Sequence, residues 1–87
     1  MTETQVEVLD QVGLHARTAG IFAKKAMLFT SKITVGRDIN VVNGKSMLSL
    51  MSLGIKQGMT IHIIAEGVDE KEAINTLSSL VKNNFKD

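Results

Sequence analysis

The sequence lacks several residue types on which protein chemistry often depends. Its 87 residues include no cysteine, proline, tryptophan or tyrosine, and the two histidines are His15 and His62. The absence of cysteine excludes disulfides, thiolate zinc sites, iron–sulfur clusters and cysteine nucleophiles. The apolar share of 44% and the charged share of 22% are those of an ordinary globular chain.

Long apolar runs are also missing, and residues 1–10 do not have the pattern of a secretory leader. Residues 1–10 contain no basic region followed by an apolar stretch, so they predict no secretory signal. Residues 61–65 are among the longest largely apolar runs, far short of the ~18 residues of a membrane span. We therefore expect a cytoplasmic protein without membrane insertion. The length predicts one domain, residues 1–87, with a modest core and no internal cavity for a cofactor.

Charge is unevenly distributed, although the net formal charge is +1. Residues 11–60 contain seven lysines and arginines against one aspartate, whereas both flanking segments are net acidic. A basic surface attracts acidic partners or phosphate. The middle segment is therefore a candidate docking surface, and a solvated face without a partner fits the charge pattern equally well.

Apolar periodicity predicts strands and helices that alternate along the chain. The expected strands, in which inward apolar residues alternate with outward polar ones, are 5–9, 32–37, 39–42 and 59–66. The first expected helix runs from Ala16 to a stop at residues 30–31. The second runs from an N-cap at Ser46 to about Leu53. The last begins with a capping box of Asp69 and Glu72.

This order, βαββαβα, indicates an α+β fold. The outward strand positions are polar, so one sheet face should be open to solvent and the helices should share the other face. We therefore expect an open-faced β-sandwich, with a four-stranded antiparallel sheet and three helices on one face.

Three familiar kinds of site do not fit the sequence. Residues 44–46 end like a phosphate-binding loop, but the first glycine of that motif would have to stand at Ile39. His15 and His62 have no cysteine and no histidine four residues away, so we expect no metal site. An RNA-binding sheet needs aromatic residues on outward strand positions. The aromatic residues lie outside the central strands, at Phe22, Phe29 and Phe85.

The segment Gly13-Leu14-His15-Ala16-Arg17 combines groups suited to phosphoryl transfer. His15 stands where the first helix should begin, so the free N–H groups of the first turn and the helix dipole form an anion site beside its ring. Arg17 can turn its guanidinium toward the same anion. We predict that the His15 imidazole accepts a phosphoryl group, whose oxygens are held by the backbone amides of Ala16 and Arg17. A polar helix cap with an exposed histidine is the alternative.

The same segment resembles the active-site segment of HPr, the histidine-containing phosphocarrier family of the bacterial phosphoenolpyruvate:sugar phosphotransferase system. Residues 45–54, KSMLSLMSLG, resemble the regulatory-serine helix of that family. Residues 43–45 and 65–70 also fit, so the resemblance covers essentially the whole chain. Two motifs at matching positions are specific, whereas one would be weak.

The resemblance implies a phosphocarrier rather than an enzyme, with catalysis supplied by partners and with no cofactor. His15 would accept phosphate from phospho-enzyme I and donate it to sugar-specific IIA proteins or domains, while Arg17 stabilises the group. Ser46 would be the regulatory site modified by HPr kinase/phosphorylase. We expect a monomer that does not bind nucleic acid directly.

A docking surface for these partners is also implied. Besides Arg17, it would comprise Gly20, Ile21, Lys24, Met47, Leu48, Met51 and Ser52. The residue pattern agrees, because a short second helix cannot bury every one of its apolar residues, and exposed methionines adapt to several partners. Burial of Met47 and Met51 in the core is the alternative.

One position departs from the family pattern, which usually has a proline after the arginine. This chain has Thr18 there. In the first turn of a helix, proline restrains the backbone without the loss of an intrahelical bond. We therefore expect Thr18 to loosen the site slightly and to alter transfer rates without abolishing function.

A second function remains open at the level of sequence. The chain could act as a regulatory binding protein through phospho-Ser46, as corepressor of a catabolite-control transcription factor. HPr-like regulators that lack the histidine show that such a role exists, and both roles can coexist. The presence of His15 favours the carrier.

Overall fold

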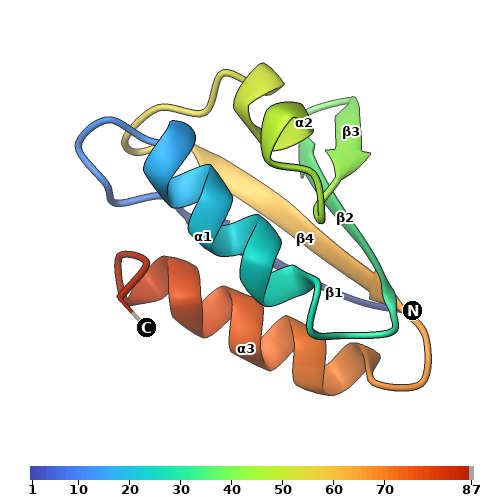
Figure 1. The fold of residues 1–87 in the computed structure, drawn as a ribbon. Coiled ribbons are helices and arrows are strands. Elements are labelled where there is room, and N and C mark those ends of the chain that lie inside the picture. Colours follow the sequence, from blue (N-terminus) through green and yellow to red (C-terminus); the bar gives the residue numbers. More distant parts are fainter. Residues whose placement is uncertain (87) are drawn as a thin grey trace.

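The computed structural model describes residues 1–86. They contain four strands and three helices, joined by loops (Figure 1). In chain order they are β1 Thr2–Glu7, α1 Ala16–Ala26, β2 Lys32–Arg37, β3 Asn40–Asn43, α2 Met47–Ser52, β4 Thr60–Glu66 and α3 Glu70–Lys82. The predicted βαββαβα order is confirmed.

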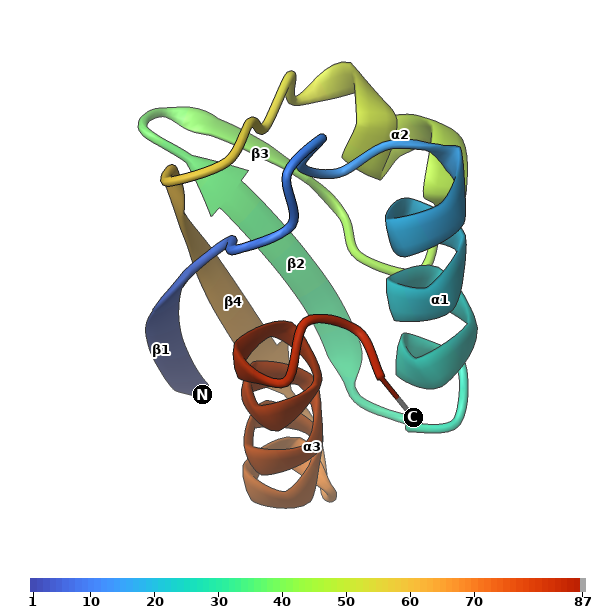
Figure 2. The same cartoon turned by 90° about the vertical axis from the view of Figure 1, so that its left-hand side faces the viewer.

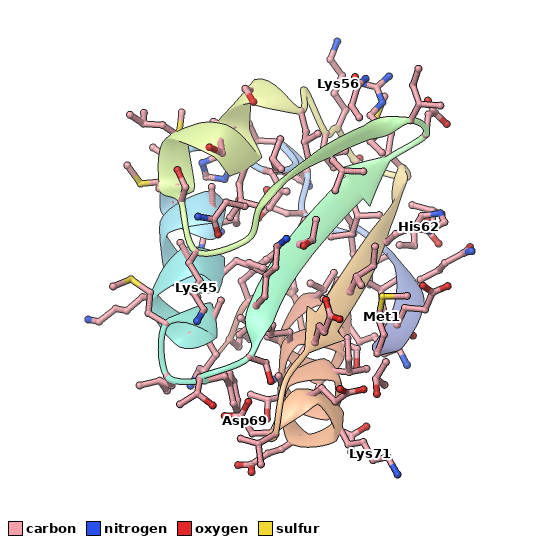
Figure 3. All side chains as sticks on the ribbon, turned by 90° about the vertical axis from the view of Figure 1, so that its right-hand side faces the viewer. Met1, Lys45, Lys56, His62, Asp69 and Lys71 are labelled. Atoms are coloured by element: carbon pink, nitrogen blue, oxygen red, sulfur yellow. The ribbon has the colours of Figure 1, made fainter. Side chains whose placement is uncertain are left out.

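The strands form one antiparallel sheet in the order β1-β4-β2-β3. Within it, Ile61 of β4 pairs with Val6 of β1. Ile63 of β4 pairs with Val35 of β2, and these residues point to the buried face. The helices cover that face (Figure 2), whereas His62 projects from the opposite one (Figure 3). The open-faced sandwich predicted from the sequence is therefore confirmed.

The helices are short and amphipathic, with 11, 6 and 13 residues in α1, α2 and α3. The two longer helices bury apolar residues that recur with the helical period, which are Ala19, Phe22, Ala23 and Ala26 in α1 and Ala73, Ile74, Leu77, Leu80 and Val81 in α3. Helix α1 ends at Ala26 and thus earlier than the predicted stop at residues 30–31. Within the described residues, none of the helices is long and apolar enough to cross a membrane.

The first strand differs most from its predicted bounds. It was expected at residues 5–9 but spans Thr2–Glu7, because pairing with β4 extends to Thr2 opposite Ala65. Val8 remains buried, and its amide donates to the Met59 carbonyl at 2.9 Å. The alternation of residues 5–9 identified the buried positions correctly, but tertiary pairing decided where the strand begins.

The next hairpin shifts by one residue. β3 begins at Asn40 rather than at Ile39, because Asp38 adopts the left-handed conformation in the turn, with φ of 55°, and Asn40 pairs with Arg37. β4 likewise begins at Thr60 rather than at residue 59. These differences leave the inward and outward faces unchanged.

The expected capping box of α3 is wrong. Asp69 is the N-cap residue, but its side chain makes no hydrogen bond to the helix. Its carboxylate instead accepts from the Thr30 amide at 2.9 Å, the Ser31 amide at 3.0 Å and the Ser31 hydroxyl. These bonds, led by the Ser31 hydroxyl, lower the pKa of Asp69 from 3.8 to about 2. Asp69 therefore ties the start of α3 to the loop before β2.

The ends of α2 agree with the sequence. The Ser46 side chain accepts from the Ser49 amide at 3.2 Å, which confirms the predicted N-cap. After the C-cap residue Leu53, Gly54 adopts a φ of +65° and stops the helix, as its position predicts. Arg37 Nη1 donates to the Leu53 carbonyl at 2.9 Å, so β2 also satisfies the end of this helix.

Candidate functional site

The loop between β1 and α1 is held by the segment that follows α2. The Leu14 amide donates to the Ile55 carbonyl at 3.1 Å, and the Leu14 side chain is buried. Gly13 lies so close that a Cβ would stand 2.2 Å from the Ile55 oxygen, and its φ is +86°. A side chain at this position would push the loop away, so glycine is required where the loop enters α1.

His15 is the N-cap residue of α1, and its backbone is extended. Its side chain is 31% exposed. The Nδ1 atom lies 3.4 Å from the Arg17 amide and faces the start of the helix, where it acts as hydrogen-bond acceptor. The predicted relation between the imidazole and the helix N-terminus is therefore present. The geometry also distinguishes the two ring nitrogens, because Nδ1 is the one that faces the backbone amides.

Thr18 fastens this turn. Its hydroxyl donates to the Gly13 carbonyl at 2.7 Å and accepts from the His15 amide at 3.1 Å. Its side chain is fully buried. These two bonds connect the loop to the first turn of α1, so they oppose the loosening expected from the absence of proline.

Asp10 is a site residue that the sequence reasoning missed. It is 7% exposed, and its Oδ1 accepts from the Val12 amide at 2.9 Å. The same oxygen lies 3.4 Å from His15 Nε2, while Oδ2 accepts from Arg17 Nη2 at 2.9 Å. The Val12 amide is the largest cause of a lowered pKa at Asp10, and the charges of His15 and Arg17 act in the same direction. The available sequence signal was a short acidic residue at a turn, in the pattern Asp-Gln-Val-Gly.

The arrangement suits nucleophilic attack by Nδ1. A carboxylate accepts hydrogen bonds but does not donate them, so a neutral imidazole with its proton on Nε2 satisfies both Asp10 and the Arg17 amide. Nδ1 then carries a lone pair. A phosphoryl group bound there would lie beside the first amides of α1, those of Ala16 and Arg17, as the sequence predicts.

The Arg17 side chain points to Asp10 in this structure. Its side chain is 57% exposed, and the ion pair to Asp10 holds the guanidinium at the edge of the site. An open hollow of about 540 Å³ surrounds this edge, with Gln57 and Asn84 among its lining residues. The C-terminal segment that contains Asn84 thus reaches the site from the end of α3 (Figure 1).

The docking residues predicted on α1 and α2 lie on neighbouring helices. A Cβ at Gly20 would stand 3.3 Å from Met47 Sδ, so Gly20 of α1 and Met47 of α2 are neighbours. Met47 is 40% exposed, Leu48 75% and Met51 36%. Lys24 and Ser52 are also exposed, and Ile21 is half-buried. The alternative, that Met47 and Met51 belong to the core, is therefore wrong.

Ser46 borders this apolar surface. Its side chain caps α2, and the residue is half-buried. The neighbouring Lys45 does not extend freely into solvent, since its Nζ donates to the Phe29 carbonyl at 2.7 Å (Figure 3). The predicted regulatory serine and the predicted docking residues are thus adjacent.

Two other sequence features do not gather into a site. His62 lies on the open face of the sheet, away from the helices (Figure 3). In residues 1–86, no three histidine, aspartate or glutamate side chains are grouped so that they could hold a metal ion.

Comparison with known proteins identifies the family. A family model described as "PTS HPr component phosphorylation site" matches residues 2–83. The chain belongs to the HPr family. The HPr-like protein Crh of Halalkalibacterium halodurans is 46% identical over 82 residues, which are 94% of this chain and 98% of the relative. Phosphocarrier protein HPr of Mycoplasma pneumoniae is 46% identical over 83 residues, which are 94% of each chain.

Solved HPr structures share the fold. HPr-C-His from Thermoanaerobacter tengcongensis matches with a TM-score of 0.95 at 42% identity, over 100% of this chain and 98% of that chain. An HPr dimer from the same organism matches with a TM-score of 0.79 at 42% identity, over 100% of both chains. The matched relatives thus include a phosphocarrier protein HPr and an HPr-like protein Crh, and a dimer has been solved for one HPr.

Proposed function

We propose that this chain is a phosphoryl carrier of the sugar phosphotransferase system. It accepts phosphate on His15 from phospho-enzyme I and passes it to sugar-specific IIA proteins or domains. The observation that carries this proposal is the placement of His15 Nδ1 at the N-terminus of α1 in a chain of the HPr family.

The chemistry consists of two phosphoryl transfers, one to His15 and one from it. The Nδ1 lone pair attacks phosphorus, a nitrogen–phosphorus bond forms, and the bond between phosphorus and its donor breaks. In the second transfer the IIA nucleophile attacks the same phosphorus, and its bond to Nδ1 breaks. The amides of Ala16 and Arg17 and the Arg17 guanidinium hold the phosphoryl oxygens. The chain has no turnover chemistry of its own in this proposal, needs no cofactor and works in the cytoplasm.

The proposal is tested by incubation of the protein with phosphoenolpyruvate and enzyme I, followed by intact-mass measurement and acid treatment. We expect one added phosphoryl group that is lost in acid and does not form on His15→Ala. The control variant is His62→Ala, which removes the histidine of the open sheet face and should be phosphorylated like the parent. Absence of an adduct on the parent would overturn the proposal.

A second function is regulation through phospho-Ser46, with HPr kinase/phosphorylase and a catabolite-control transcription factor as partners. Two observations favour it: the similarity to an HPr-like protein Crh, and the position of Ser46 beside the exposed residues of α2. ATP and HPr kinase should give an acid-stable adduct that is absent from Ser46→Ala. If the parent acquires no such adduct, the second function is wrong, while the first stands.

The variant Ser46→Asp tests whether a negative charge at the regulatory site affects phosphorylation of His15. Aspartate can keep the N-cap of α2, so we expect the fold to remain intact. Its negative charge beside the docking residues should slow phosphorylation of His15 by enzyme I, since the expected partner is acidic. Initial rates at several enzyme I concentrations measure the effect. Equal rates for parent and variant would contradict it.

We further propose that the carrier acts as a monomer. The docking residues Met47, Leu48 and Met51 are exposed in the single chain and thus available to partners. The dimer solved for Thermoanaerobacter tengcongensis HPr is the competing state. Sedimentation equilibrium over a wide range of concentrations should give the mass of one chain, and a concentration-independent dimer would contradict this.

A further inference from the structure

We propose that Asp10 is a positioning residue that sets the proton of His15 on Nε2 and exchanges partners when the phosphoryl group arrives. Before transfer its carboxylate pairs with Arg17. After transfer it pairs with the cationic ring of phospho-His15, and Arg17 turns to the phosphoryl oxygens. The second half of this inference rests on the proposed function, whereas the first half concerns the unmodified protein.

The position of the carboxylate explains the choice of ring nitrogen. Oδ1 lies 3.4 Å from His15 Nε2, and on the other side of the ring Nδ1 faces the Arg17 amide at 3.4 Å. One side of the imidazole thus meets an acceptor and the other meets a donor. The tautomer with hydrogen on Nε2 turns its N–H toward the carboxylate and its lone pair toward the amide, whereas the other tautomer turns a lone pair toward the carboxylate and an N–H toward the amide N–H.

Asp10 is itself held rigidly, as a positioning residue must be. Its Oδ1 accepts from the Val12 amide at 2.9 Å, and its backbone carbonyl accepts from the Gly13 amide at 3.0 Å. With 7% of its surface exposed, the residue has little freedom to turn away from His15. The carboxylate therefore lies in a turn that leads directly into the histidine.

The partner exchange follows from charge. Attack by neutral imidazole leaves a positive charge on the ring, with hydrogen still on Nε2, next to the Asp10 carboxylate. The phosphoryl group brings negative charge to the side of the ring that faces α1. Arg17 bonds Asp10 at 2.9 Å but is 57% exposed, so it can turn from a carboxylate that now has a cationic neighbour to a more highly charged anion.

No other charged side chain competes among the described residues that line this hollow. Apart from Asp10, His15 and Arg17, the lining residues are Leu9, Gln11, Val12, Gln57 and Asn84. Replacement of the Asp10 carboxylate by an amide should therefore change the electrostatic environment of the ring with little compensation.

The first test uses the unmodified protein. Long-range ¹⁵N–¹H NMR correlations of the imidazole report which nitrogen carries the proton in the neutral ring. We expect the Nε2–H form to predominate for His15 in the parent. Predominance of the Nδ1–H form would overturn the assignment of Asp10, whatever the function of the protein.

The second test uses protein phosphorylated chemically with phosphoramidate, so that it does not depend on enzyme I. Phosphorus forms a bond to His15 Nδ1, its bond to the phosphoramidate nitrogen breaks, and ammonia leaves. Loss of the phosphoryl group is then followed as a function of pH by intact mass. Asp10→Asn removes the carboxylate that faces the cationic ring, so the variant should lose the group more slowly than the parent at a given pH.

The matched control is Glu7→Gln, which removes one negative charge from an exposed position on β1. Its pH profile should coincide with that of the parent. Coincident profiles for Asp10→Asn and the parent would overturn the proposal. Slower loss from Asp10→Asn together with failure of enzyme I to phosphorylate the parent would support the role of Asp10 and reject the proposed carrier function. If the amide spectrum of Asp10→Asn differs from that of the parent, the variant is not folded like the parent. The proposal is then tested by the His15 tautomer of the parent alone.

Discussion

Thr18 contributes to the site through a hydroxyl that proline could not supply. The resemblance described above implies that relatives usually have proline at this position, where its restraint acts on the backbone of the helix start. The chain reaches a similar restraint by hydrogen bonds, because the Thr18 hydroxyl joins the Gly13 carbonyl to the His15 amide. Thr18 thus replaces the restraint of a proline ring with two hydrogen bonds of its hydroxyl.

This interpretation predicts the behaviour of Thr18→Val, which keeps the shape of the side chain and removes the hydroxyl. The variant should lose ~1–3 kcal/mol of unfolding free energy, because the two hydrogen bonds of the buried hydroxyl are lost, at ~0.5–1.5 kcal/mol each. Urea denaturation measures the loss, and amide exchange at His15 should become faster. Thr18→Ser retains the hydroxyl, so exchange at His15 should remain close to that of the parent. Equal exchange in both variants would contradict the role of the hydroxyl.

Helix α2 shows how a short element divides its residues between core and surface. Six residues are too few for a stable isolated helix. Its structure depends on the Ser46 cap, on the bond from Arg37 to its last turn, and on Leu50, which is completely buried. Leu48, two residues earlier, is 75% exposed. The helix is therefore fixed to the core by one face and exposes an apolar side chain on another.

The pair Leu50→Ala and Leu48→Ala separates these two roles. Leu50→Ala should reduce the unfolding free energy by ~2–5 kcal/mol, since it leaves a cavity in the core. Leu48→Ala should change it by no more than about 0.5 kcal/mol, as expected for an exposed side chain. In enzyme I assays, Leu48→Ala should instead raise KM. A normal KM for Leu48→Ala would show that this face of α2 is not a docking surface.

At the scale of the whole molecule, two carboxylates join parts of the chain that are distant in sequence. Asp69 holds the loop at Thr30 and Ser31. Glu70 accepts from the Thr2 hydroxyl and the Gly67 amide and pairs with the amino group of Met1 at 2.9 Å. The Thr2 hydroxyl is the largest cause that lowers the pKa of Glu70 from 4.5 to about 2. Both acids therefore stabilise the folded chain in their ionised form.

The direction of the acid response follows from these pKa values. Since the folded pKa of each acid lies below its ordinary value, its stabilising effect is complete above the unfolded pKa of about 4 and is lost as pH falls through the folded pKa of about 2. Tm should thus fall steeply across this range. Asp69→Asn should have a lower Tm near neutral pH and a shallower fall in acid. The control Glu3→Gln, at an exposed position of β1, should follow the parent. If Tm falls with pH in parallel for Asp69→Asn and the parent, the stabilising role of the bonds from Thr30 and Ser31 to Asp69 is contradicted.

The features that can be predicted from the sequence are those in which the decisive forces act between residues close in the chain. The buried stripes of α1 and α3 follow from helical periodicity, and the Ser46 cap acts on an amide three residues away. The place of His15 at the start of α1 is equally local. These features require no knowledge of what the rest of the chain does.

Tertiary structure decided the contacts between segments that are distant or that turn back on themselves. A local pattern offered Glu72 as the partner of Asp69, but the folded chain brings Ser31, 38 residues away, within reach of the carboxylate. β1 begins at Thr2 because β4 supplies a partner there. Asp10 meets both His15 and Arg17 because the loop folds back onto the start of α1. Periodicity and capping act over a few residues, so the order of residues is enough to predict which elements form, which faces they bury and which histidine begins a helix. The carboxylate that faces this histidine becomes visible in the folded chain, because its position depends on the path of the loop through space.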